Sequence, residues 1–201
     1  VSNSLLFNNL PYDWQKDFAP VTPIYKAEFV LVMHPSVKAN TLQELVALAK
    51  SNSRQLSYGS SGNGNVNHIM AELFAQATGI SLLHVPYKGG APASAAVASG
   101  EVGLSLISLG SALNFVKGGK AKALAITRAT RHPSFPEWPT VKESGVQNFA
   151  ESIWIGLAAP TGTPREIVNR LSTEVGRALR SSELRERLAA MGSEPVGTTP
   201  D

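Results

Sequence analysis

The residues best suited to chemistry lie in one short stretch, YGSSGNGNVNH, which runs from Tyr58 to His68 and leads into a helical pattern. It holds three glycines, three asparagines and two serines in eleven residues. Glycine lets a backbone approach a ligand closely, and the first turn of a helix leaves backbone N–H groups without partners. A junction of this kind is suited to holding an anion.

Two other kinds of chemistry that use glycine-rich loops are poorly supported. The glycines follow the spacing GxxGxG, which is not the dinucleotide fingerprint, and the stretch lacks the lysine of a phosphate-binding loop. A serine hydrolase would require GxSxG, which the tetrapeptide GSSG misses by one residue. An enzyme with Ser61 as nucleophile and His68 as base stays open as an alternative, but we expect His68 to cap or pack the first helical turn.

Two further loops share these properties. The segment VPYKGGAP, residues 85–92, offers the amphipathic ring of Tyr87, the charge of Lys88 and two glycines for a turn. Ser108 and Ser111 stand where a strand ends and a helix begins. Each loop alone is ordinary turn chemistry. Because ligands bind beyond the carboxyl ends of the strands in a parallel α/β sheet, the three together predict a binding site at one edge.

Composition narrows the range of partners. The 201 residues include 18 basic and 15 acidic side chains, giving a formal charge of +3 without any run of like charge, so we expect no nucleic-acid partner. There is no cysteine, and the four histidines have no paired spacing, so we expect no metal and no cofactor. The longest apolar runs are too short to span a bilayer.

The pattern of elements predicts an α/β fold on a largely parallel sheet. Thr41 and Glu44 form a capping box, Gly79 ends a helix, and Thr163 with Pro164 begins another. Strands are predicted over residues 29–33, 56–59, 81–85, 102–108, 121–127 and 152–159, and helices over 41–51, 65–78, 92–99, 111–117, 164–180 and 182–191.

Several stretches together resemble the Bug family, the TctC-like periplasmic solute-binding proteins of tripartite tricarboxylate transporters. They are LPYDWQKDFAPVTPI, VLVMHPSVKANTLQELVALAK, LSYGSSGNGNVNHIMAELF, HVPYKGGAPA, KALAITRATRHPSFPEWPTVKESG and WIGLAAPTGTP. The resemblance runs from Leu5 to Asp201. It implies a type II periplasmic binding protein, in which two α/β lobes joined by two crossover strands close over a small carboxylate like a Venus flytrap, without catalysis.

The resemblance also implies how the chain is divided. Residues 1–32 and 153–201 would be part of the first lobe, which is incomplete in this chain, and residues 33–152 would form the second lobe. The crossover strands would be Phe29 to Met33 and Ser152 to Leu157. Val1 is not a methionine, and Thr198 to Asp201 (TTPD) have the form of a helix start, so we expect the chain to be an internal piece of a longer protein.

The site and the function follow from the same resemblance. The resemblance implies an extracytoplasmic protein that works in the periplasm as a monomer. Its implied function is to capture a small carboxylate or amino acid in the cleft between the lobes. It would deliver this ligand to the membrane permease subunits of a tripartite tricarboxylate transporter. A hydrolase-like two-lobed enzyme and a ligand-sensing module for a receptor are the alternatives, and the solute itself stays open. The implied ligand contacts, through backbone N–H groups and hydroxyls, are Ser60, Ser61, Gly62, Asn63, Gly64 and Asn65, with Pro86, Tyr87 and Ser108 lining the same site.

Overall fold

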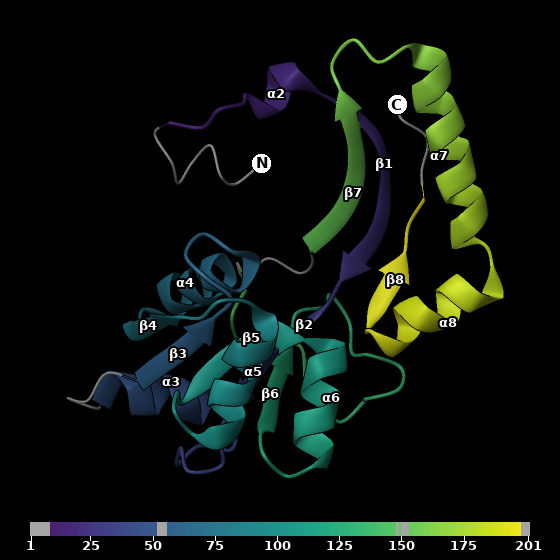
Figure 1. Ribbon diagram of the computed structural model, residues 1–201. Helices are drawn as coiled ribbons and strands as arrows, with labels where there is room; N and C mark the ends of the chain where they lie inside the picture. The colour runs from purple at the N-terminus through teal and green to yellow at the C-terminus, as the bar shows by residue number, and fades with distance from the viewer. Residues whose placement is uncertain (1–8, 52–55, 148, 150–152, 198–201) are drawn as a thin grey trace. The chain divides into compact units, whose positions relative to one another are not determined.

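The computed structural model describes residues 9–51, 56–147, 149 and 153–197, and the chain divides into two compact units (Figure 1). Unit 1 comprises Val1–Ala27 and Ile153–Asp201, and unit 2 comprises Glu28–Ser152. Strand β2 (Phe29–Met33) lies wholly in unit 2, because both strands that pair with it belong to that unit. The sequence analysis had assigned most of β2 to the first lobe. Ser152 and the terminal TTPD lie outside the described residues.

Unit 2 is built on a five-stranded sheet with the strand order β4-β3-β5-β2-β6. Strands β3 and β4 are parallel, as are β3 and β5, whereas β2 runs antiparallel to both of its neighbours. The sheet is therefore largely parallel, as the sequence predicts, with β2 as the single reversed strand. The strands are β2 (Phe29–Met33), β3 (Leu56–Ser60), β4 (Leu82–Pro86), β5 (Leu104–Ser108) and β6 (Lys122–Ile126).

The helices of unit 2 are placed by the direction of each crossover. Strand β4 lies on one side of β3 and β5 on the other, so the β3-to-β4 and β4-to-β5 connections run in opposite directions. Because such connections are right-handed, α4 and α5 cover opposite faces of the sheet. Helix α6 packs against α5 and shares its face. The helices are α3 (Leu42–Ser51), α4 (Val66–Thr78), α5 (Gly90–Ser99) and α6 (Leu109–Lys117).

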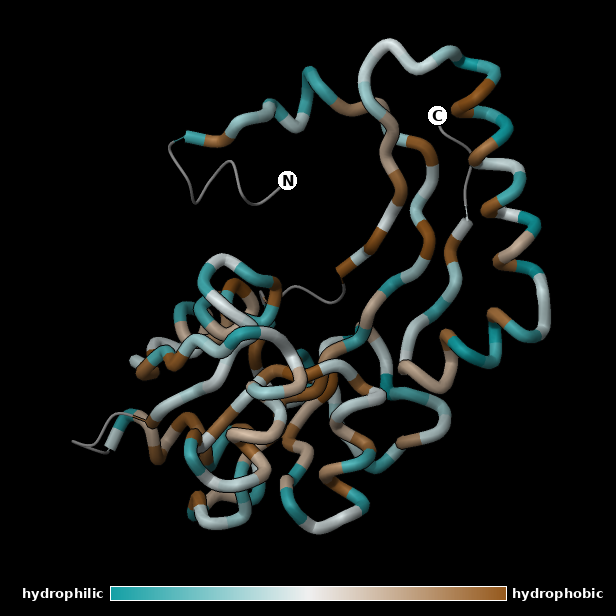
Figure 2. Tube along the Cα trace, in the orientation of Figure 1, coloured by the Kyte–Doolittle hydropathy of each residue, from teal (hydrophilic) through white to brown (hydrophobic). Residues whose placement is uncertain are grey.

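The core of unit 2 follows from burial on both faces of the sheet. All five residues of β2 are buried, which explains its continuous apolar sequence FVLVM. On the face covered by α5 and α6, Val30, Val32, Val97 and Ile107 belong to one buried cluster. Figure 2 shows apolar segments running through the strands of this unit. The sheet is thereby held rigidly enough to position the loops at its ends.

Unit 1 holds a three-stranded antiparallel sheet with the order β7-β1-β8. Two of its strands, β1 and β8, and the short helix α2 were not predicted from the sequence. Strand β1 contains Pro20 and Pro23, and its register with β7 shifts just after each proline, so the irregularities accommodate residues that lack an N–H. The elements are α2 (Trp14–Asp17), β1 (Phe18–Ala27), β7 (Ile153–Pro160), α7 (Arg165–Leu179), α8 (Ser182–Ala190) and β8 (Ser193–Pro195).

The other elements lie within two residues of their predicted bounds. The Glu44 N–H donates to Thr41 Oγ1 (3.1 Å), as the capping box predicts, and Gly79 ends α4 in the left-handed conformation. The cap predicted for α7 is wrong, because Pro164 is the N-cap and the Thr163 hydroxyl donates instead to the Pro160 carbonyl (2.7 Å). Among the described residues, no helix is both long and apolar enough to cross a membrane.

Candidate functional site

The three predicted loops meet at the carboxyl edge of the sheet in unit 2. Strands β3, β4 and β5 are parallel neighbours that end at Ser60, Pro86 and Ser108. The chain leaving β3 enters α4 on one face, whereas the chain leaving β5 enters α6 on the other face. This divergence is a topological switch point, where ligands bind in open α/β sheets.

The glycine-rich loop between β3 and α4 turns tightly enough to need two of its glycines. Gly62 has φ 126° and Gly64 has φ 71°, both in the region that residues with a side chain rarely adopt. The Asn65 N–H donates to the Gly62 carbonyl (3.2 Å), and Asn65 is the N-cap of α4. Among the described residues, the backbone N–H groups of Ser61 and Asn63 donate to no protein acceptor. They remain available to a ligand.

Two histidines, His68 and His84, form hydrogen bonds that hold this loop in place. The Ser60 hydroxyl lies 2.6 Å from His84 Nε2, and the Gly64 N–H donates to His68 Nδ1 (3.0 Å). The two imidazoles stack with their centroids 4.0 Å apart. Burial and the neighbouring His68 hold the pKa of His84 below its usual range, so this ring is neutral near pH 7.

The second layer of support joins the histidine pair to the protein core. Tyr58 stacks on His84 with ring centroids 4.9 Å apart, and its hydroxyl donates to Glu72 Oε1 (2.6 Å). Burial, followed by the contact with Glu72, raises the pKa of the Tyr58 hydroxyl well above its usual range, so it stays protonated. Each end of the loop is therefore tied to a ring that is itself fixed.

Asn67 forms a third tie. Its side chain is buried, its Nδ2 donates to the Leu106 carbonyl on β5 (3.0 Å), and its Oδ1 accepts from the Ser61 hydroxyl (2.5 Å). The amide thus connects the loop after β3 to the middle of β5. The sequence analysis did not select this residue, because nothing in a local pattern shows that an asparagine in the second position of a helix reaches another strand.

The loop after β4 lies directly against the first. The Tyr87 N–H donates to the Ser60 carbonyl (2.9 Å), and its hydroxyl donates to Glu101 Oε1 (2.8 Å). Burial, followed by the contact with Glu101, raises the pKa of Tyr87 to about 12, so the hydroxyl stays protonated near neutral pH. A Cβ at Gly59 would come within 3.3 Å of the Tyr87 ring, which explains why a glycine precedes Ser60.

Two more helices begin at this edge without side-chain caps. Gly89 precedes α5 and Ser108 precedes α6, and neither residue has a side-chain oxygen that accepts from a backbone N–H of its helix. The Ser108 hydroxyl pairs instead with that of Ser111 (3.0 Å). With α4, three helix N-termini end at one sheet edge, and their dipoles favour an anion there.

The structure places all nine predicted contact residues on this edge, but not with equal exposure. Ser60 is completely buried, so its hydroxyl supports the loop. The others are partly or fully exposed: Ser61, Gly62, Asn63, Gly64, Asn65, Pro86, Tyr87 and Ser108. The supporting residues Asn67 and His84 were not selected as part of the site, although His84 immediately precedes the predicted VPYKGGAP loop.

The arrangement gives little support to nucleophilic catalysis. Ser61 donates to Asn67, and His68 Nδ1 accepts from a backbone N–H, so these two side chains do not form the pair that a hydrolase requires. Ser60 does contact a histidine, but it has no exposed surface through which a substrate could reach it. Among the described residues, no group of three or more histidine or carboxylate side chains could hold a metal ion.

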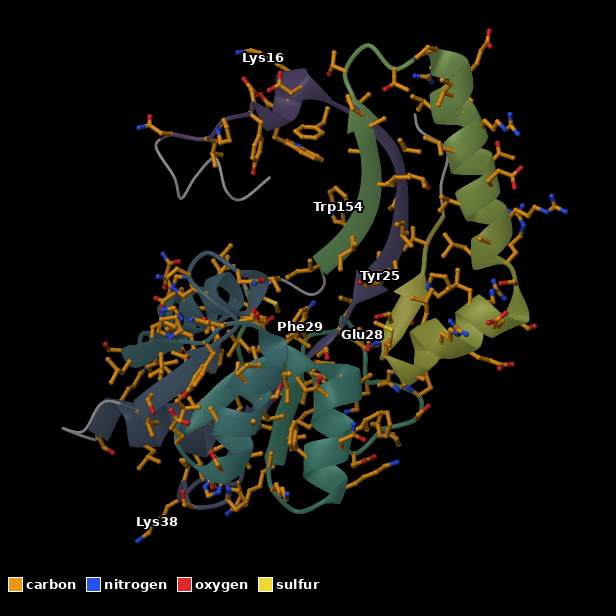
Figure 3. All side chains as sticks on the ribbon, in the orientation of Figure 1. Lys16, Tyr25, Glu28, Phe29, Lys38 and Trp154 are labelled. Atoms are coloured by element: carbon orange, nitrogen blue, oxygen red, sulfur yellow. The ribbon has the colours of Figure 1, made fainter. Side chains whose placement is uncertain are left out.

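One buried ion pair lies close to the same edge. Arg128, two residues after β6 ends, contacts Glu28, the residue that precedes β2. The side chain of Glu28 is only 5% exposed and that of Arg128 is 17% exposed. Figure 3 labels Glu28 and Phe29 where β1 gives way to β2. Since this arginine already faces a carboxylate, its charge is largely neutralised.

Comparison with known proteins identifies the family. The model of the tripartite tricarboxylate transporter family receptor matches residues 2–200, so the chain belongs to this family. The protein BugT of Bordetella pertussis is 33% identical over 196 residues, which cover 98% of this chain and 60% of BugT. A Pseudomonas sp. protein encoded between tcbD and tcbE is 32% identical over 202 residues, with 60% of its length covered.

Solved structures agree on the fold. The structure of R. palustris Rpa4515 with adipate superposes with a TM-score of 0.88 at 34% identity, covering 96% of this chain and 65% of that chain. MatC from Rhodopseudomonas palustris with bound malate gives a TM-score of 0.86 at 31% identity, with the same coverage. These matches confirm the predicted type II periplasmic binding protein fold. The chain spans about three fifths of the length of the curated relatives it matches.

Proposed function

We propose that the protein is an extracytoplasmic solute-binding protein that captures a small organic acid and delivers it to a membrane permease. In this proposal the ligand carboxylate is held by the loops at the carboxyl edge of unit 2, and no bond is made or broken. The protein works as a periplasmic monomer whose partners are the permease subunits of a tripartite tricarboxylate transporter. Its family is one of solute-binding receptors.

The observation that carries the proposal is the convergence of three helix N-termini on a loop with free backbone N–H groups. The N–H groups of Ser61 and Asn63 supply donors, and the Asn65 amide, whose Oδ1 accepts from the Val66 N–H (2.8 Å), presents its Nδ2 as a further donor. Neutral donors and helix dipoles can hold a carboxylate without a lysine or arginine. Solved relatives contain adipate and malate.

Calorimetric titration of the whole protein with a panel of small carboxylates tests the proposal. At least one acid should bind with heat and remain chemically unchanged after long incubation. The Asn65→Ser variant keeps a capping oxygen for α4 but removes the Nδ2 donor, so it should bind that acid about fivefold more weakly, the loss expected for one neutral hydrogen bond of about 1 kcal/mol. Asn114→Ser, at an exposed position in the C-terminal half of α6, is the matched control and should bind normally.

The outcomes separate the alternatives. Consumption of the acid, with turnover lost in His68→Ala, would identify an enzyme instead. Absence of binding by every acid, after any co-purified ligand has been removed by unfolding and refolding, would refute the carboxylate site. Capture of a receptor rather than permease subunits by the liganded protein would identify a sensing module.

A further inference from the structure

The direction of one hydrogen bond in the site is fixed by the groups around it. A backbone carbonyl can only accept, so the Asn67 amide atom 3.0 Å from the Leu106 oxygen must be the nitrogen Nδ2. The other amide atom, Oδ1, then lies 2.5 Å from Ser61 Oγ. Since Oδ1 also only accepts, Ser61 must donate its hydroxyl proton to Asn67.

Ser61 therefore has no proton left for a ligand. A serine hydroxyl has one donor and two acceptor lone pairs, and here the donor is used inside the protein. Ser61 is partly exposed, whereas Asn67 is 6% exposed, so the accessible end of this pair is the acceptor end of Ser61. This differs from the expectation that the loop hydroxyls donate to a ligand.

The groups around Ser61 have the opposite character. Its own backbone N–H and that of Asn63 are free to donate, and the nearby N-terminus of α4 favours negative charge. A carboxylate held by the Ser61 N–H lies within reach of Ser61 Oγ, because both groups belong to one residue, so a substituent on the carbon next to the carboxylate could contact that oxygen. A second carboxylate oxygen facing Ser61 Oγ would place lone pair against lone pair.

We propose that Ser61 selects acids that carry a hydroxyl on the carbon next to the bound carboxylate, so that the solute is a 2-hydroxy acid. The ligand hydroxyl donates to Ser61 Oγ. An ammonium group at the same place is disfavoured because three helix N-termini are directed at this edge. The inference rests on the proposed function and specifies its substrate class. Of the acids in the solved relatives, malate carries such a hydroxyl and adipate does not.

Matched pairs of acids test the inference in the whole protein. The pairs are lactate and propionate, malate and succinate, and 2-hydroxyglutarate and glutarate, each titrated by calorimetry at the same pH and salt. In the pair that fits the site best, the hydroxylated acid should bind about tenfold more tightly, which corresponds to about 1.4 kcal/mol and lies within the range for one neutral hydrogen bond. Aspartate should bind more weakly than malate.

The Ser61→Ala variant tests whether this residue makes the selection. It should still bind both members of the pair, with the preference reduced to about twofold or less, because the backbone donors are retained while the acceptor and the hydrogen bond to Asn67 are lost. Ser99→Ala is the matched control, since this hydroxyl donates to the Ala96 carbonyl (3.1 Å) at the C-terminal end of α5. It should keep the full preference.

The failures are distinguishable. Equal or tighter binding of the unsubstituted acid by the wild-type protein overturns the inference and leaves the carboxylate site standing. A preference that survives Ser61→Ala overturns the role of Ser61. Absence of binding by all six acids and by the wider carboxylate panel overturns the proposed function, and the inference with it.

Discussion

Strands β2 and β7 show how differently the two units are packed. Every residue of β2 is buried in unit 2, whereas β7 in unit 1 leaves Trp154 58% and Ile155 41% exposed. Figure 3 shows the Trp154 side chain beside β7. The sheet of unit 2 has helices on both faces, and a strand buried on both sides gains apolar burial at every position. The candidate site is built on unit 2, whose central strand is buried on both faces, which suits a site that needs fixed donors.

The largest expected effect comes from truncating one leucine in each unit. Leu104 in β5 is 1% exposed and Leu157 in β7 is 37% exposed. Leu104→Ala should lower the free energy of unfolding by about 3 to 4 kcal/mol, because it leaves a cavity in the core, and Leu157→Ala by less than about 1 kcal/mol. Urea unfolding of both variants measures the difference. Equal losses would show that exposure in β7 does not reflect looser packing.

A smaller effect is expected from breaking one ion pair in each unit. Arg128→Met leaves the buried Glu28 without its arginine and should cost about 2 to 3 kcal/mol, somewhat less than for a fully buried pair because Arg128 is partly exposed. Arg187 pairs with Glu183 on the surface of α8, with side chains 74% and 77% exposed. Arg187→Met should cost less than about 0.5 kcal/mol. Thermal unfolding of both variants at low and high salt measures these losses. A large loss in Arg187→Met that disappears at high salt would show that the surface pair contributes more than predicted.

The smallest effect is a dependence of stability on pH that arises in unit 2. The pKa of His84 is lowered by burial and by His68, while Glu72 acts in the opposite direction. The unfolded chain therefore binds this proton more strongly, so stability is full above the ordinary imidazole pKa of about 6.5 and falls as the pH drops below it. His84→Gln retains a hydrogen-bonding partner for Ser60 and should flatten the dependence.

Urea unfolding at about pH 7.5, 6.5 and 5.5 measures that dependence. The loss between the highest and lowest pH should be smaller than the effect of Leu104→Ala. His132→Gln, in the connection after β6, serves as the control and should leave the pH profile of the wild-type protein in place. A His84→Gln profile as steep as that of the wild type would assign the dependence to another group.

Local chemistry made every helix except the short α2 predictable. The Thr41 cap depends on residues three positions apart, and the end of α4 depends on Gly79 alone. Caps that depend on residues only a few positions apart can be read directly from the sequence. The exception is Thr163, whose hydroxyl donates to the Pro160 carbonyl while Pro164 becomes the N-cap, so the local rule fails there.

The supports of the site could not be found in this way because their partners are distant in sequence. Ser60 and His84 are 24 residues apart, and Asn67 and Leu106 are 39 residues apart. A glycine-rich stretch before a helix predicts where an anion binds, but the donor or acceptor role of each hydroxyl is decided by the strand that lies behind it. Strand β1 was missed for the opposite reason, since its two prolines resemble a loop until the register shifts that accommodate them are seen.

The position of β2 has a consequence for the newly made chain. Among the described residues this apolar strand pairs with β5 and β6 alone, and β6 ends at Ile126, whereas β2 ends at Met33. A ribosome adds about 5 to 20 residues per second, so FVLVM waits on the order of 5 to 20 seconds before its second partner exists. During this interval the segment is an exposed apolar stretch that is prone to aggregation. A holdase chaperone that binds it would protect the protein until synthesis reaches β6.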